Sequence, residues 1–81
     1  MRVNVLYFAS FREAAGRNRE TRELPEGSSV ADLWGALQSE IPYLQAFTRM
    51  PPPAVNREHV DGGKRLADGD EVAFLPPVAG G

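Results

Sequence analysis

The C-terminal residues Gly80 and Gly81 carry the group in this sequence that is best placed for chemistry, the α-carboxylate. The two glycines have no Cβ and wide conformational freedom, whereas Pro76 and Pro77 stiffen the backbone just before them. Residues 76–81 can extend over about 20 Å, which suits a thin, flexible tail that carries the carboxylate into another protein's active site. The alternative interpretation is a frayed chain end without function.

A carboxylate is resonance-stabilised, so it reacts only after activation, most simply as an acyl-adenylate formed from ATP. The nearest likeness to a phosphate-binding loop is Gly63-Lys64, but Glu58 stands where the first glycine of that motif belongs. Arg65 also replaces its final Ser or Thr. We therefore expect a partner enzyme to use the ATP. We expect this chain to bind no cofactor and to have no enzymatic activity of its own.

The composition argues against several other classes of function. The 81 residues include no cysteine and one histidine, His59, which we expect in a surface loop. Thiolate chemistry is thereby removed, and a metal site is disfavoured. Asp68 and Asp70 flank a glycine in a predicted turn, so we expect no acid–base role for them. A net charge of −2 argues against nucleic acid, and no apolar run or leader pattern indicates a membrane or secretion, so we expect a cytoplasmic protein.

One domain, residues 1–81, is expected at this length, with 76–81 as its extended tail. Its clearest element is a helix over residues 30–41, which Ser29 caps with Asp32 at the capping-box spacing. Apolar residues recur along this helix at i, i+3, i+4 and i+7, which predicts one buried face.

The other predicted elements are shorter. They comprise strands at 2–8, 19–24, 54–56 and 71–75, a short helix at 9–15 that Gly16 ends, and a loose helical turn at 43–50. This order favours the α+β class, with a mixed sheet and one main helix across one face. The predicted core contains Val3, Val5, Leu33, Leu37, Val72 and Phe74.

Three segments resemble the small subunits of molybdopterin synthase. They are residues 5–16 (VLYFASFREAAG), 54–56 (AVN) and 68–81 (DGDEVAFLPPVAGG), of which the first and last are the most specific. Residues 17–50 and 57–64 add little to the resemblance. The resemblance implies a ubiquitin-like β-grasp fold, with four to five strands, one main helix and a flexible Gly-Gly tail.

The resemblance also implies a function. Members of this family are adenylated on their last glycine by an ATP-dependent activating enzyme and then converted to a thiocarboxylate. The tail enters the large catalytic subunit, in a complex expected to be a heterotetramer. There the sulfur passes to cyclic pyranopterin monophosphate. By position, the reactive group here is the carboxyl of Gly81, with Gly80 as its slim neighbour.

The alternation of side chains predicts a partner-binding surface. Leu6 and Phe8 lie on the face of the first strand opposite to its predicted core residues, and Leu75 faces the same way on the last strand. Because a β-grasp fold places these strands side by side, we expect one apolar patch. We predict that it contacts partners together with Pro76 and Pro77. Scattered surface apolar residues are the alternative.

Other functions remain open at this point. The same chemistry can serve thiamin synthesis or tRNA thiolation, because those carriers share the fold and the Gly-Gly end. A ubiquitin-like modifier that forms isopeptide bonds to lysines and an interaction module with an inert tail are further possibilities. The segments 8–16 and 75–78 favour the molybdopterin interpretation.

Overall fold

The computed structural model describes residues 1–76, and the predicted tail residues Pro77, Gly80 and Gly81 lie outside this range. The elements are β1 (Arg2–Leu6), α1 (Ala9–Ala15), β2 (Arg19–Glu23), α2 (Val30–Glu40), the 3₁₀ helix η1 (Pro42–Ala46), β3 (Pro53–Val55), β4 (Glu58–His59) and β5 (Glu71–Phe74). All strands and both helices that the sequence predicts are present. The predicted helical turn at 43–50 is the shorter η1.

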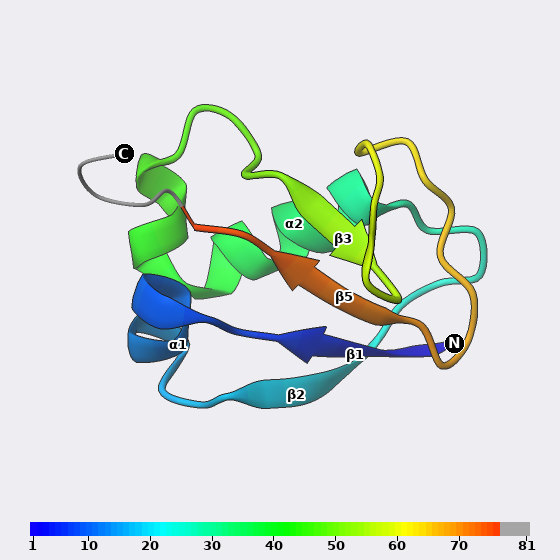
Figure 1. Ribbon diagram of the computed structural model, residues 1–81, viewed down its shortest axis with the longest axis horizontal. Coiled ribbons are helices and arrows are strands. Elements are labelled where there is room, and N and C mark those ends of the chain that lie inside the picture. Colours follow the sequence, from blue (N-terminus) through cyan, green and yellow to red (C-terminus); the bar gives the residue numbers. More distant parts are fainter. Residues whose placement is uncertain (77–81) are drawn as a thin grey trace.

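Five strands form one mixed sheet in the order β2-β1-β5-β3-β4. The strands β1 and β5, which come from opposite ends of the described chain, are parallel and adjacent. The remaining pairings within residues 1–76 are antiparallel. Figure 1 shows α2 lying across one face of this sheet. The predicted α+β architecture and the predicted adjacency of the first and last strands are therefore confirmed.

The helix α2 begins with the predicted capping box. The Ser29 hydroxyl accepts a hydrogen bond from the Asp32 N–H at 3.2 Å, and the Asp32 carboxylate accepts one from the Ser29 N–H at 2.9 Å. The bond from the Ser29 N–H is the main cause that lowers the pKa of Asp32 below its usual value. These bonds satisfy backbone donors that a helix start leaves unpaired. The buried face of the helix contains Val30, Leu33, Trp34 and Leu37.

Alternate residues of β1 and β5 meet this face of α2. Val3 and Val5 of β1 and Val72 and Phe74 of β5 are buried. Fully burying a side chain of this kind stabilises a fold by about 1.5–3 kcal/mol. All six predicted core residues belong to the core. The opposite face of β1 and β5 is therefore the one that the main helix leaves uncovered.

The strand β4 is missing from the elements that the sequence predicts. It pairs with β3 through a two-residue turn, Asn56 and Arg57, whose φ values are +52° and +71°. Tight hairpin turns of this kind normally place glycine at the second position. Arginine there conceals the turn signal in the sequence. His59 consequently lies in β4 and not in a loop, although it is exposed as expected.

Candidate functional site

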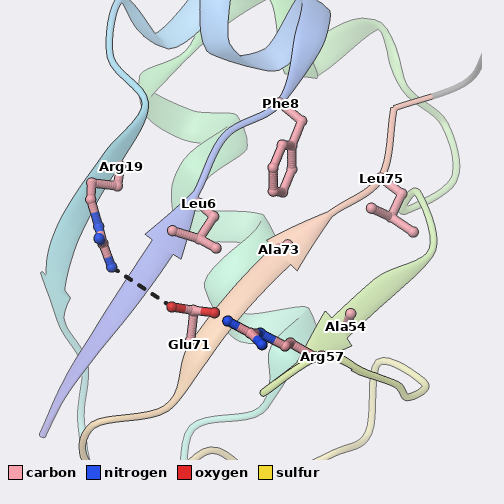
Figure 2. A pocket seen from close by; sticks show the side chains of 8 residues that line it. All are labelled: Leu6, Phe8, Arg19, Ala54, Arg57, Glu71, Ala73 and Leu75. Carbon is pink, nitrogen blue, oxygen red and sulfur yellow. Dashed lines mark ion pairs between the residues drawn. The ribbon is translucent and has the colours of Figure 1, made fainter.

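A groove of about 410 Å³ lies over β1 and β5 on the face of the sheet away from α2. We call it the β1/β5 groove. Figure 2 shows its lining side chains, of which Leu6, Phe8 and Leu75 surround the small Ala73. The full lining is Leu6, Phe8, Arg19, Ala54, Arg57, Glu71, Ala73 and Leu75. The three apolar residues that the sequence predicts as one patch are therefore together in the structure.

The parallel pairing of β1 with β5 creates the hollow. Leu6 pairs in register with Ala73, so both side chains point to the same face. Phe8 and Leu75 lie two residues further along each chain and continue that face. Because Ala73 has only a methyl group, the larger neighbours rise around it and leave a floor. Sequence parity predicts this face, but it does not predict that Ala73 forms the bottom of a groove.

Phe8 is held in an exposed position by the start of α1. It is the N-cap residue of that helix, and its carbonyl accepts hydrogen bonds from the N–H groups of Phe11 at 2.9 Å and Arg12 at 3.2 Å. This is why β1 ends at Leu6, two residues before the predicted end. The residue remains 45 % exposed, whereas Phe11 is only 2 % exposed. A fixed backbone thus presents a large aromatic side chain to solvent at the groove.

The chain leaves the sheet beside the groove. The Leu75 N–H donates to the Pro52 carbonyl at 2.9 Å, which anchors the residue that follows β5. Leu75 is half-buried, and so is Pro76, the last described residue. Pro76 is not among the groove residues. Pro77, Gly80 and Gly81 lie outside the described range, so their predicted roles stay predictions.

Three charged residues border the groove, and the sequence analysis missed all three. Arg19 of β2 pairs with Leu6 across the sheet, which brings its side chain to the same face. Its guanidinium lies 3.7 Å from the Glu71 carboxylate. Arg57 approaches from the β3–β4 turn (Figure 2). The parity of Glu71 with Leu75 could have identified Glu71, but the two arginines required knowledge of strand pairing.

The other polar candidates support the fold. The Asp68 carboxylate accepts a hydrogen bond from the Arg2 N–H at 2.7 Å, and the Asp70 carboxylate accepts one from the Ala67 N–H at 2.8 Å. Both therefore hold the predicted turn. Within residues 1–76, no cluster of three or more His, Asp or Glu residues could bind a metal ion. No helix in this range is long and apolar enough to cross a membrane.

Tyr7 is the one described tyrosine with a perturbed hydroxyl. It lies on the core side of the chain, and burial is the main cause that raises its pKa above the ordinary value. Its hydroxyl also donates a hydrogen bond to the Glu20 carboxylate, which raises the pKa further. The hydroxyl thus stays protonated and satisfied, so we assign it a structural role.

Full-length relatives of this chain are sulfur carrier subunits. The "Molybdopterin synthase sulfur carrier subunit" of Mycobacterium tuberculosis is 43 % identical, over 100 % of this chain and 99 % of that protein. The protein of the same name from Chlamydomonas reinhardtii is 41 % identical over 100 % of both chains. A third relative, "Small archaeal modifier protein 3" of Haloferax volcanii, is 34 % identical over 100 % of both.

Solved structures agree with these relatives. A putative molybdopterin converting factor, subunit 1, from Pyrococcus furiosus has a TM-score of 0.87 and 35 % identity, over 96 % of this chain and 99 % of that one. The complex of subunits 1 and 2 of molybdopterin-converting factor from Helicobacter pylori contains a chain with a TM-score of 0.71 and 26 % identity, over 100 % of both. Residues 5–81 also match the ThiS family. The chain therefore belongs to the ThiS family and has the ubiquitin-like β-grasp fold that the sequence predicts.

Proposed function

We propose that this chain is the sulfur carrier subunit of a molybdopterin synthase. The observation that carries the proposal is the position of the β1/β5 groove, which adjoins the point where the chain leaves β5 at Leu75 and Pro76. A partner that covers Phe8 and Leu75 is therefore next to the start of residues 77–81. The full-length relatives named molybdopterin synthase sulfur carrier subunit support the same function.

The proposed chemistry takes place on the carboxyl of Gly81. An activating enzyme attacks ATP with this carboxylate, which forms the acyl-adenylate and releases pyrophosphate. Sulfur delivered by another protein then displaces AMP and leaves a thiocarboxylate. In the large subunit, the sulfur passes to cyclic pyranopterin monophosphate and the carboxylate is restored. This chain supplies the carrier and the docking surface, and its partners supply ATP binding and catalysis.

The groove serves as the docking surface in this proposal. Leu6, Phe8 and Leu75 are exposed or half-buried on a rigid sheet, and contiguous apolar surface of this kind is typical of partner-binding sites. We expect the activating enzyme and the large subunit to bind the same groove in turn. The carrier must then leave one partner before it can bind the other, so excess large subunit should inhibit adenylation.

Reconstitution tests the function directly. The large subunit, the precursor and chemically thiocarboxylated carrier are mixed, and molybdopterin formation is measured. We expect product only with the thiocarboxylated chain. A matched carrier with one residue added after Gly81 should give none, because the added residue displaces the reactive carbon by about 3.5 Å. Full activity from the extended carrier contradicts the proposal.

Conjugation to lysines is a second candidate function, because one full-length relative is named a modifier protein. Mass spectrometry of the chain purified from its native cells separates the candidates. A mass increase that corresponds to sulfur in place of oxygen indicates a carrier. Isopeptide-linked adducts indicate a modifier. A thiocarboxylate combined with inactivity in the reconstituted synthase indicates a carrier for thiamin synthesis or tRNA thiolation.

A further inference from the structure

The turn between β3 and β4 contains an arginine in an unfavourable backbone conformation. Asn56 and Arg57 both have positive φ, at +52° and +71°. Asparagine tolerates this region, and the Asn56 side chain donates to Asp70 and accepts from the Glu71 N–H, both at 3.0 Å. Arg57 has no comparable compensation, because within residues 1–76 its side chain forms neither a hydrogen bond nor an ion pair. Glycine would fit the turn better.

The side chain of Arg57 extends into the border of the β1/β5 groove. Figure 2 shows its guanidinium on one side of Glu71, with Arg19 on the other side. Glu71 is paired with Arg19 at 3.7 Å. Two guanidinium groups thus share one carboxylate, which leaves this border positive although the chain as a whole has a net charge of −2. An exposed cation beside an apolar floor is suited to a partner that offers both kinds of contact.

We propose that Arg57 binds a carboxylate of the partner protein, on a segment whose apolar side chain occupies the groove over Ala73. This inference rests on the proposed function, because it assumes that the groove is the docking surface. The planar guanidinium can hold a carboxylate with two parallel hydrogen bonds, and partial removal of water by the apolar segment strengthens them. A free anion lacks the apolar part that most of the groove lining would contact.

Arg57 would also select between partners. A segment that presents Asp or Glu next to its apolar anchor is attracted to this border, whereas a segment with Lys or Arg there is repelled. Because guanidinium and carboxylate attract each other before contact, the pair should increase the association rate most strongly at low ionic strength. The arginine at a position that favours glycine thus has a stated use in recognition.

The test compares Arg57 with another exposed cation outside the groove. Lys64 is suitable, because it lies in the loop beside the start of α2, where its carbonyl accepts from the Val30 N–H at 3.0 Å. Arg57→Gln and Lys64→Gln remove the same charge from the full chain. Arg57→Gly removes the side chain and also fits the positive φ, so it separates loss of the guanidinium from changes in the turn. Dissociation constants for the large subunit are measured by titration calorimetry at low and high salt.

We expect both Arg57 variants to weaken binding about fivefold or more at low salt, with a smaller difference at high salt. Lys64→Gln should stay within about twofold of the wild type. Arg57 variants that bind as Lys64→Gln does, while Phe8→Ala weakens binding, overturn this inference and leave the proposed function standing. Normal binding by Arg57→Gly alone also overturns it, since the effect then comes from the turn. A wild-type chain that does not bind the large subunit overturns the proposed function itself.

Discussion

Replacing Phe8 by alanine separates binding from folding. Phe8 is 45 % exposed, so a partner can still remove that fraction of the residue from water. An aromatic residue buries about 200 Å², so the exposed part is about 90 Å². At about 25 cal/mol per Å², its burial contributes about 2 kcal/mol to binding, a factor of about 30 in the dissociation constant. The covered part of the ring contributes at most about 2 kcal/mol to folding, which the domain can lose without unfolding.

Two aromatic residues provide matched controls. Tyr43 is also 45 % exposed but does not line the groove, so Tyr43→Ala should leave the affinity for the large subunit unchanged. Phe11 is 2 % exposed and packs on Phe47 with ring centroids 5.4 Å apart, so Phe11→Ala should cost about 3–5 kcal/mol of folding stability. Calorimetric titration and urea unfolding measure both quantities. If Phe8→Ala binds like the wild type, or unfolds as Phe11→Ala does, our assignment of Phe8 to a docking face is wrong.

Three further predictions concern the tail and the main helix. Deleting Gly81 should abolish molybdopterin formation yet change the free energy of unfolding by less than about 0.5 kcal/mol, which activity assays and thermal melts of one preparation can compare. Gly35→Ala should stabilise the fold by about 0.5–1 kcal/mol and raise the Tm by several degrees, because an added Cβ meets no atom within 4 Å; a lower Tm contradicts this. Ser29→Ala should cost about 1 kcal/mol at neutral pH. Because the folded state lowers the pKa of Asp32, its contribution is present above the unfolded pKa of about 4 and is lost as pH falls through the folded pKa, so urea unfolding should show a smaller cost for Ser29→Ala at low pH.

Much of the fold could be predicted because local and long-range signals agree. Ser29 and Asp32 have the types and spacing of a capping box, and both hydrogen bonds are formed. The parity of β1 predicts that Val5 is buried and Leu6 is not, and the structure bears out both. The groove face follows from the same parity once β1 and β5 are adjacent. That adjacency came from family resemblance, because the pattern of a single chain does not fix strand order.

The parts that could not be predicted depend on pairing or on an unusual residue. The β3–β4 hairpin was hidden because Arg57 occupies a turn position where glycine is the recognisable signal. Arg19 reaches the groove only because β2 pairs with β1 in a register that sets it opposite Leu6. No local pattern specifies that register. The charged border was therefore invisible in the sequence, whereas the apolar part of the groove was not.

The pairing of β1 with β5 lets one pair of strands support folding and recognition at the same time. Val5 pairs with Val72 on the core face, and the next pair, Leu6 and Ala73, lies on the groove face. Because side chains alternate, a one-residue slip would exchange the two faces, and burial of the valines against α2 opposes that slip. The core thus positions the groove without burying it. Substitutions at Leu6 should mainly change partner affinity, whereas substitutions at Val5 should change both stability and affinity, because they displace the strand that forms the groove.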